Sequence, residues 1–147
     1  MLTDNCISHG FDIRVRYSDT DQMGVVYYGN YPRFFEIGRT EFLRSIGLPY
    51  ATLEADGFQL PVLELHARYH KPARYDDLIT VEATLDTEAL GATFEIEYVI
   101  RRSADVLVTG STKHAFVRAG DFQPVRPPHQ FRQALETAAL HKRQERS

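Results

Sequence analysis

The chain has 147 residues, enough for one domain that buries a hydrophobic core without disulfides or a structural metal. Apolar residues make up 43% of the chain, aromatic residues 12% and charged residues 25%, so it has the composition of a globular protein and not of a disordered or fibrous one. Seventeen basic residues against 20 acidic residues give a net charge of −3. This balance gives no reason to expect nucleic acid or an anionic membrane as the main partner.

The single cysteine, Cys6, excludes an intrachain disulfide and a cysteine-rich zinc site. The first residues carry neither a basic segment nor a long apolar segment, so no signal peptide is expected. No segment approaches the ~20 apolar residues of a membrane-spanning helix. These observations predict a cytoplasmic protein without a membrane span.

A strand and a long helix are the first elements expected along the chain. Residues 11–18 alternate apolar and polar side chains, which predicts a half-buried strand after a loose lead-in. Apolar residues recur at helical spacing over 31–46, with Asn30 before them as an N-cap and Gly47 after them as a stop signal. The helix over 31–46 is the best-supported element of the chain.

Four further runs of residues predict strands. They are Leu63–His70, Ile79–Leu85, Phe94–Arg101 and Val106–Arg118. The breaks between these runs are short, which favours an antiparallel meander. After Pro127-Pro128 the sequence predicts a short helix over about 129–140 and then a frayed basic tail.

The order of one strand, one helix and four strands predicts the fold class. The aromatic face of a helix about 24 Å long has to be buried against another element. A five-stranded antiparallel sheet curved around the helix provides that surface, so the expected class is α+β with one long central helix. We expect one domain over residues 1–147, with its core at about 11–118 and the short helix and tail at 127–147.

Several common sites find no support in the sequence. The glycine-rich signatures of serine hydrolases, P-loops and dinucleotide-binding folds are absent. His66 and His70 are four residues apart, but in a strand this spacing separates them by roughly 13 Å, so they are not expected to share a metal. Asp19 opens a segment like a calcium loop, yet Met23 stands at a position where calcium needs an oxygen ligand, and Asn30 stands where the loop needs a bidentate Glu. We therefore predict no metal and no separate cofactor.

A pair of carboxylates occupies the turn between the first strand and the long helix. Taken alone, Asp19-Thr-Asp21 is explained by turn chemistry, because Asp side chains close backbone turns. The helix that follows offers unpaired backbone N–H groups and the positive end of its dipole, which can polarise a carbonyl oxygen. A carboxylate a few residues earlier can reach the carbon of the same carbonyl, or a water beside it. This is the minimum equipment for acyl transfer without a serine or cysteine nucleophile.

The segment Y-S-D-T-D-Q-M-G-V-V-Y-Y-G-N-Y over 17–31, continued by Phe34-Phe35-Glu36 and Arg39-Thr-Glu41, resembles the acyl-CoA thioesterases of the hotdog fold. It is most similar to the 4-hydroxybenzoyl-CoA thioesterase group, including its Tol-Pal-associated bacterial branch. The resemblance extends over roughly 11–117, and residues 71–77 are similar to the family's loop between the second and third strands. It implies a hotdog fold and hydrolysis of an acyl-CoA to free acid and coenzyme A, with coenzyme A as part of the substrate.

The resemblance also implies roles for individual residues. Asp21 matches the catalytic carboxylate, either as nucleophile on the thioester carbon or as general base for water. The backbone N–H of Tyr28 matches the group that hydrogen-bonds the thioester oxygen, although the bacterial branch often has histidine at this position. Asp19 is interpreted as turn-forming. Glu64 is interpreted as part of a solvated strand face, with a second catalytic carboxylate as the alternative.

The remaining candidates are residues that would bind the substrate. They are Gly24, Tyr27, Asn30, Lys71, Arg74, Arg101 and Arg102. The four cations suit the phosphates of coenzyme A, although exposed charges beside a hairpin explain them equally well. In the family the coenzyme site is shared between subunits, and exposed sheet edges can pair between copies. We therefore expect a homodimer or homotetramer.

Two other functions stay open at this level. A non-catalytic module that binds acyl-CoA or an acyl carrier would keep the pocket and the cations without the chemistry. A hydratase would need a histidine a few residues after its Asp, and none falls between His9 and His66. The preferred acyl group also stays open, because Tyr27, Tyr28, Phe34 and Phe58 either line the pocket or pack in the core.

Overall fold

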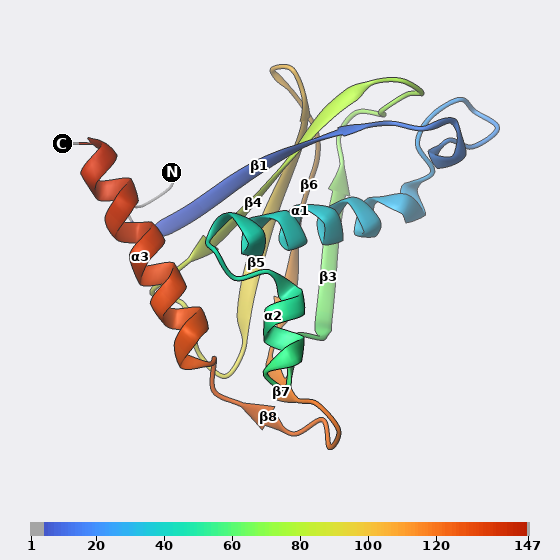
Figure 1. Ribbon diagram of the computed structural model, residues 1–147. Coiled ribbons are helices and arrows are strands. Elements are labelled where there is room, and N and C mark those ends of the chain that lie inside the picture. Colours follow the sequence, from blue (N-terminus) through green and yellow to red (C-terminus); the bar gives the residue numbers. More distant parts are fainter. Residues whose placement is uncertain (1–4, 147) are drawn as a thin grey trace.

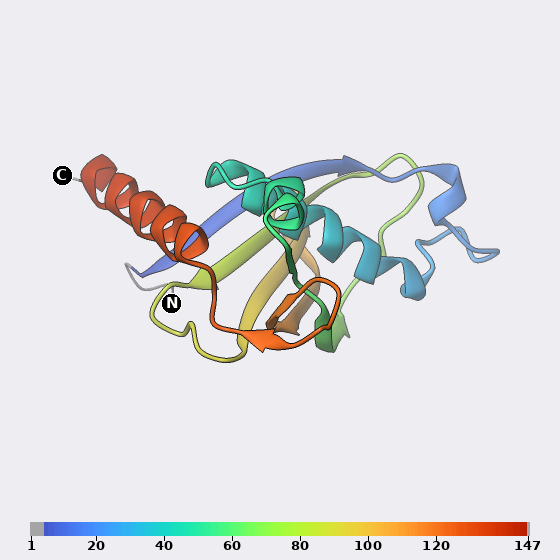
Figure 2. The same cartoon turned by 60° about the horizontal axis from the view of Figure 1, so that its bottom comes forward.

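The computed structural model describes residues 5–146 as an α+β fold in which a long helix lies against one face of a sheet (Figure 1). The five strands of the main sheet are antiparallel and lie in the order β1-β4-β5-β6-β3. They are β1 (Cys6–Arg14), β3 (Val62–Tyr69), β4 (Leu78–Asp86), β5 (Phe94–Arg102) and β6 (Asp105–His114). The helix α1 (Tyr31–Ser45) packs against β1, β4 and β5 (Figure 2).

The segments that connect these strands and α1 contain smaller helices and strands. Two 3-10 helices, η1 (Tyr17–Asp19) and η2 (Tyr28–Asn30), lie between β1 and α1, and the short helix α2 (Tyr50–Ala55) follows α1. A second sheet consists of β2 (Phe58–Gln59), β7 (Phe116–Arg118) and β8 (Pro124–Val125). The helix α3 (His129–Arg146) follows β8 and lies at the end of the molecule away from η1 and η2 (Figure 1).

The sheet confirms the five antiparallel strands around a helix but not the meander. β4, β5 and β6 follow one another as expected, whereas β3 pairs with β6 and not with β4, the next strand in sequence. The segment 70–77 therefore crosses from the edge strand β3 past β6 and β5 to β4, the strand next to the other edge. The meander was wrong because alternation reveals the two faces of a strand and carries no information about its partner.

The first strand begins earlier than expected. Residues 6–10 pair with β4 in the same unbroken register as residues 11–14, so the predicted lead-in is the first half of β1. Gly10 interrupts the alternation there, which hid the strand in the sequence. At its other end the strand stops at Arg14, and residues 17–19 turn into η1 instead of extending it.

The other differences concern the ends of helices and strands. The expected run 106–118 is divided into β6 and β7, and the short helix over 129–140 extends to Arg146 as α3. The helix α2 was not expected. Pro49, which precedes its first residue, serves both to end α1 and to begin α2.

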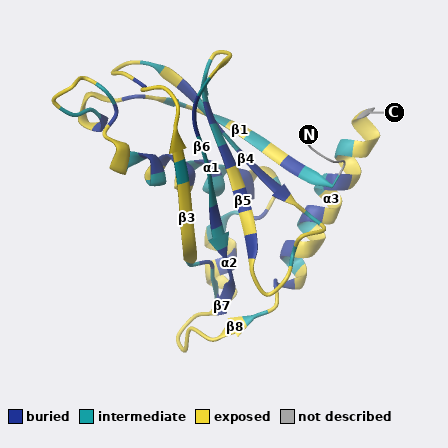
Figure 3. Cartoon of the chain, turned by 180° about the vertical axis from the view of Figure 1, so that it is seen from behind, coloured by how far each residue is buried: buried dark blue, intermediate teal, exposed yellow. Residues whose placement is uncertain are grey.

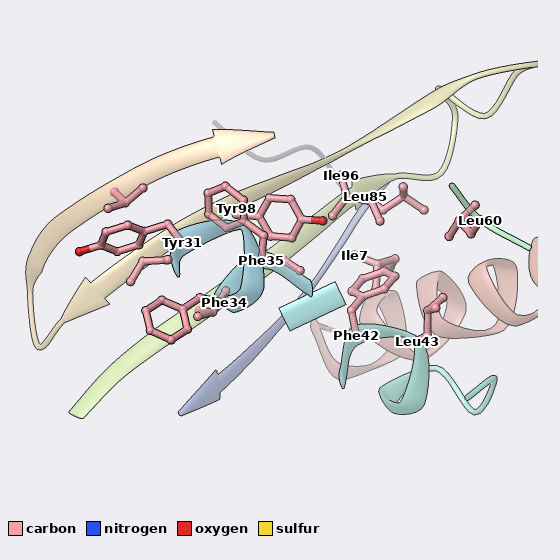
Figure 4. Close-up of a cluster of buried hydrophobic side chains, with 14 of the residues drawn as sticks. Ile7, Tyr31, Phe34, Phe35, Phe42, Leu43, Leu60, Leu85, Ile96 and Tyr98 are labelled. Atoms are coloured by element: carbon pink, nitrogen blue, oxygen red, sulfur yellow. The ribbon is translucent and has the colours of Figure 1, made fainter. Parts of the chain in front are cut away.

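Apolar residues at helical spacing explain α1, which confirms the helix predicted over 31–46. Its buried residues are Tyr31, Phe34, Phe35, Gly38, Phe42 and Leu43. Figure 4 shows Phe35 of α1 beside Tyr98 of β5, with the two rings side by side. The two rings are stacked with their centroids 4.5 Å apart.

Two glycines permit this close approach of helix and sheet. A Cβ atom on Gly38 would lie 2.7 Å from Cγ1 of Val81 on β4. A Cβ atom on Gly110 of β6 would lie 2.6 Å from the Phe35 ring and 2.4 Å from the carbonyl oxygen of His66. Because real side chains do not come this close, α1 is held at a distance from the sheet that only glycine allows.

A buried chain of hydrogen bonds connects α1 with the start of β3. The Arg39 guanidinium donates to the Tyr98 hydroxyl at 3.0 Å, which lies 2.6 Å from the Thr112 hydroxyl. The Thr112 hydroxyl lies 2.7 Å from Nε2 of His114, whose Nδ1 lies 3.1 Å from the carbonyl oxygen of Pro61. A carbonyl only accepts, so Nδ1 carries the proton, Nε2 accepts, and each hydroxyl donates towards His114. Burial, together with the charge of Arg39, lowers the pKa of His114 to about 4.

The helix α3 closes the end of the sheet opposite η1 and η2. Phe131, Leu135 and Ala139 recur at helical spacing and are buried. The Phe131 ring lies 5.8 Å from the Phe94 ring and 4.9 Å from the Phe116 ring, measured between centroids. The hydrophobic core therefore extends into α3.

The strand β3 is the most exposed strand of the main sheet. Figure 3 shows it in the colour of exposed residues along most of its length, whereas β4 is buried or intermediate except at its ends and every second residue of β5 is buried over most of its length. Its apolar side chains Leu63, Leu65 and Tyr69 are 50%, 40% and 49% exposed. One side of β3 is paired with β6, and its other side has no neighbouring strand among residues 5–146.

Candidate active site

The segment between β1 and α1 folds into a tight turn that carries Asp21. Thr20 and Val26 form an antiparallel bridge, and the Asp21 N–H donates to the carbonyl oxygen of Val25 at 2.9 Å. The Gly24 N–H donates to the carbonyl oxygen of Asp21 at 3.0 Å. Gly24 has φ of +78°, a conformation that favours glycine, which explains this residue as a turn former.

Asp19 holds this turn against α1. The residue is 5% exposed, and its Oδ2 accepts the Arg16 N–H at 2.8 Å while its Oδ1 pairs with the Arg33 guanidinium. Its carbonyl oxygen accepts the Tyr27 N–H at 3.0 Å and the Asn30 amide at 2.8 Å. These contacts agree with the interpretation of Asp19 as turn-forming. Asn30 precedes α1, but its side chain makes this bond to Asp19 and does not cap the helix.

Asp21 has one fixed and one open carboxylate oxygen. Its Oδ1 accepts the Met23 N–H at 2.8 Å, and its Oδ2 has no hydrogen-bond partner among the described residues. The side chain is half-buried and lines an open hollow of about 500 Å³, which we call the Asp21 hollow. The residues around this hollow are Tyr17, Thr20, Asp21, Gln22, Gly24 and Tyr75.

Tyr28 offers an open backbone N–H at the start of the helical segment. It is the first residue of η2, which leads directly into α1, and within residues 5–146 its N–H has no acceptor. Its carbonyl oxygen accepts the Tyr69 hydroxyl at 3.2 Å, and its ring packs against Tyr27 with centroids 4.7 Å apart. Tyr28 lines a second hollow, of about 250 Å³, which we call the Tyr28 hollow. Its lining residues are Val26, Tyr28, Tyr31, Tyr69, His70, Lys71 and Pro72.

The structure therefore distributes the predicted site over two neighbouring hollows. Asp21 and Gly24 line one, Tyr28 and Lys71 line the other, and neither of these two hollows contains both Asp21 and Tyr28. Val26 connects the two groups, since it follows the Asp21 turn and lies in the wall of the Tyr28 hollow.

The loop 71–77 is fastened beside both hollows. The Val26 N–H donates to the carbonyl oxygen of Ala73 at 2.8 Å, and Val25 forms an antiparallel bridge with Arg74. Arg102 donates to Oδ2 of Asp77 at 2.7 Å and to the carbonyl oxygen of Pro72 at 3.2 Å. Burial raises the pKa of Asp77, but the Arg74 N–H and the Arg102 guanidinium outweigh this effect and hold it below its ordinary value.

The four predicted cations do not form one cluster. Lys71 pairs with Asp105 at 3.1 Å, Arg102 with Asp77 at 2.7 Å, and Arg101 with Glu82 at 3.6 Å. Arg101 lies opposite Thr80 on the sheet face that is turned away from α1, so it is not part of either hollow. Arg74 has no carboxylate at ion-pair distance in the described part of the chain.

Glu64 takes part in surface ion pairs away from both hollows. Its carboxylate lies 3.3 Å from Nε2 of His66 and 3.4 Å from Nζ of Lys113. Hydrogen bonds from His66 and from Lys113 lower its pKa. Its surroundings agree with the solvated strand face and not with a second catalytic carboxylate.

Tyr17, Tyr69 and Tyr75 line the hollows and were not among the predicted site residues. Tyr75 stands in the loop 71–77, far from Asp21 in sequence, and only the bridge between Val25 and Arg74 brings it there. Tyr69 continues the apolar alternation of β3, so the sequence pattern marked it as a strand residue and not as a site residue. The useful signal was the concentration of tyrosines in 17–31 and 69–75.

Neither a metal site nor a membrane helix stands out in the part of the chain that the structure describes. No three His, Cys, Asp or Glu side chains of residues 5–146 group together as a metal site. His66 contacts Glu64, while Nε2 of His70 lies 3.0 Å from the Thr109 hydroxyl. None of the described helices is long and apolar enough to cross a bilayer.

Comparison with known proteins identifies the class. The model of the thioesterase-like superfamily matches residues 15–135, which include both hollows and every strand of the main sheet except β1. The chain therefore belongs to the thioesterase-like superfamily, and its fold is the hotdog fold. This membership confirms the expectation of an enzyme of the thioesterase class.

Individual relatives agree with this assignment. The chain is 37% identical over 135 residues to the acyl-CoA thioesterase YbgC of Haemophilus influenzae, a match that covers 91% of this chain and 97% of that protein. Among solved structures, the DHNA-CoA thioesterase of Staphylococcus aureus superposes with a TM-score of 0.80 at 29% identity, covering 94% of this chain and 91% of that one. A hypothetical protein of Aquifex aeolicus superposes with the same TM-score of 0.80 at 34% identity, covering 86% and 98%.

Proposed function

We propose that this protein hydrolyses an acyl-CoA thioester to the free carboxylic acid and coenzyme A, with Asp21 and the Tyr28 N–H as its catalytic groups. One observation carries the proposal. An open carboxylate oxygen of Asp21 and an open N–H of Tyr28 lie on the same short segment, fastened to the start of α1. Family membership and the resemblance to YbgC support the reaction type.

The chemistry follows from these two groups. As general base, Oδ2 of Asp21 takes a proton from a water whose oxygen bonds to the thioester carbon. As nucleophile, Oδ2 bonds to that carbon itself, the thiolate leaves, and water then hydrolyses the anhydride. In both routes the Tyr28 N–H stabilises the negative charge that develops on the carbonyl oxygen. The C–S bond breaks, and the sulfur leaves as the thiol after it receives a proton.

Two of the four predicted cations are engaged within the fold, and the other two are accessible to a ligand. Arg102 holds the loop 71–77, and Arg101 lies on the opposite face of the sheet. We assign the coenzyme A phosphates first to Arg74, which has no ion-pair partner in residues 5–146, and then to Lys71, whose pair with Asp105 is exposed. Coenzyme A remains part of the substrate, and the reaction uses no separate cofactor.

A second copy of the chain completes the site in this proposal. The unpaired side of β3 and the exposed apolar side chains Leu63, Leu65 and Tyr69 form a surface suited to pairing with another copy. Tyr69 also lines the Tyr28 hollow, so a partner on β3 adds walls to the hollow that receives the thioester oxygen. We propose a homodimer at least, in the cytoplasm. The tetramer, the 4-hydroxybenzoyl-CoA type and the Tol-Pal-associated branch stay predictions from the motif.

The test is a screen for thiol release across short, long and aromatic acyl-CoAs with the wild type and with Asp21→Asn. We expect Asp21→Asn to lower kcat by about 10²–10⁴-fold, because it removes the base or nucleophile and keeps the size of the side chain. Asp121→Asn, in an exposed turn near β7, is the matched control and keeps full activity. Circular dichroism and gel filtration check that both variants keep the fold and the assembly.

A non-catalytic binding module is the competing function. The separate positions of Asp21 and Tyr28 in two hollows favour it. Tight binding of acyl-CoA by the wild type without release of thiol would establish it and overturn the hydrolase. Near wild-type hydrolysis by Asp21→Asn would keep the hydrolase and remove Asp21 from its centre.

A further inference from the structure

The two hollows differ in charge. Among the described residues that line the Asp21 hollow there is no lysine, arginine or histidine, and the one charged side chain is the Asp21 carboxylate. The Tyr28 hollow contains Lys71 and His70 and no carboxylate. A molecule with one anionic end and one neutral end is therefore oriented by the pair of hollows.

An acyl-CoA is such a molecule, since its phosphates are all on the coenzyme side of the thioester. We infer that the acyl group occupies the Asp21 hollow, that the coenzyme arm leaves through the Tyr28 hollow, and that Tyr17 and Tyr75 select uncharged acyl groups. This inference rests on the proposed function and adds the substrate class and two specificity residues to it.

The walls of the Asp21 hollow are preformed. The Tyr17 and Tyr75 rings meet edge to face, with centroids 5.6 Å apart and planes at 68°. They are 78% and 57% exposed, so they offer ring surface that is not yet used for packing. Tyr75 is held through the bridge between Val25 and Arg74, and Tyr17 begins η1 directly after β1.

The chemistry of the walls defines what they accept. The rings give apolar area to an acyl chain, while the Thr20 hydroxyl is engaged with the carbonyl oxygen of Tyr17 at 2.7 Å. An acyl group that carries its own carboxylate meets Asp21 and no compensating cation, so like-charge repulsion disfavours it. The neighbouring cations Arg16 and Arg74 do not line the hollow.

The experiment compares pentanoyl-CoA with glutaryl-CoA, which have the same number of acyl carbons and differ by a terminal carboxylate. For the wild type we expect kcat/KM to be at least tenfold higher for pentanoyl-CoA. Gln22→Lys places a cation in the hollow and raises the glutaryl-to-pentanoyl ratio at least tenfold. Gln133→Lys, at another exposed glutamine, on α3 and outside the hollow, is the matched control and leaves the ratio unchanged.

The ring pair is tested with Tyr75→Ser. We expect KM for pentanoyl-CoA to rise about tenfold with little change in kcat, while the melting temperature is kept because the ring is exposed. Equal kcat/KM values for both substrates in the wild type, or a ratio that Gln22→Lys does not move, would overturn the inference and leave the hydrolase intact. Dissociation constants of both acyl-CoAs are measured in parallel. If no thioester is hydrolysed, the proposed hydrolase fails, and the same ratio of dissociation constants still decides where the acyl group lies.

Discussion

At the scale of single residues, Tyr28 contributes both a ring and a backbone N–H to the proposed site. Mutation can remove either group, so their effects on catalysis can be measured separately. Tyr27, the residue before it, has φ of −60° and ψ of 130°, the extended conformation that a following proline requires. The N–H of Tyr28 makes no hydrogen bond within residues 5–146, so a proline here costs the fold no bond. This position therefore permits a direct test of a backbone group.

We expect Tyr28→Pro to lower kcat by about 10²–10³-fold, the loss that follows removal of one oxyanion donor. Tyr28→Ala removes the ring and keeps the N–H, so it should keep most of kcat and change KM. Steady-state kinetics of the two variants make the comparison. Equal losses of kcat in both would assign the effect to the ring and exclude the N–H as the oxyanion donor.

His114 makes stability depend on pH in a window set by its own environment. Its pKa is about 4 in the folded protein, lowered by burial and by Arg39, and 6.5 is the ordinary value that the unfolded chain has. Above pH 6.5 both states are neutral and His114 adds no pH dependence. Between pH 6.5 and 4 the unfolded state binds the proton first, so the free energy of unfolding falls by about 3 kcal/mol.

Urea unfolding at pH 7, 5.5 and 4.5 measures this loss. His114→Gln removes the titrating group and should flatten the curve over this window, although it is less stable at pH 7. Asp77 contributes separately, since its lowered pKa places its loss of stability below the ordinary value of 3.8. A slope unchanged by His114→Gln would mean that other groups produce the acid sensitivity.

At the scale of elements, the distance between α1 and the sheet is set by Gly38. We expect Gly38→Ala to destabilise the protein by about 1–3 kcal/mol, because its Cβ would lie 2.7 Å from Cγ1 of Val81 in a packed core. Gly91→Ala is the control, since the nearest atom to its Cβ would be 3.6 Å away. Chemical denaturation compares the two, and equal changes would show that α1 can move away from β4.

The elements also show what local patterns can and cannot predict. The helix over 31–46 was predicted because the apolar residues of its buried face recur at helical spacing within one continuous segment. The pairing of β3 with β6, and the arrival of Tyr75 beside Asp21, depend on backbone bonds between distant segments and leave no periodic signal. Asp21 and Tyr28 were recognised from a motif. The structure adds that each has an open polar group and that each lines its own hollow.

At the scale of the whole molecule, the exposed strand β3 predicts how the chain assembles. We expect a dimer in solution, and Leu65→Lys should shift it towards the monomer because a charge replaces an apolar side chain at the proposed interface. Leu140→Lys, on an exposed apolar residue of α3 at the other end, should leave the mass unchanged. Light scattering after gel filtration measures both. A monomeric wild type would remove the partner subunit from the proposed site.

The way in which the loop 71–77 is attached has a consequence for evolution. Main-chain bonds to Val25 and Val26 and the Arg102 guanidinium hold it, while the side chains of Arg74 and Tyr75 contribute little to its anchoring. Lineages can therefore exchange these two side chains without disturbing the scaffold. A change in substrate range then needs the replacement of only one or two amino acids. We expect new substrate ranges to arise first through replacements at these two positions.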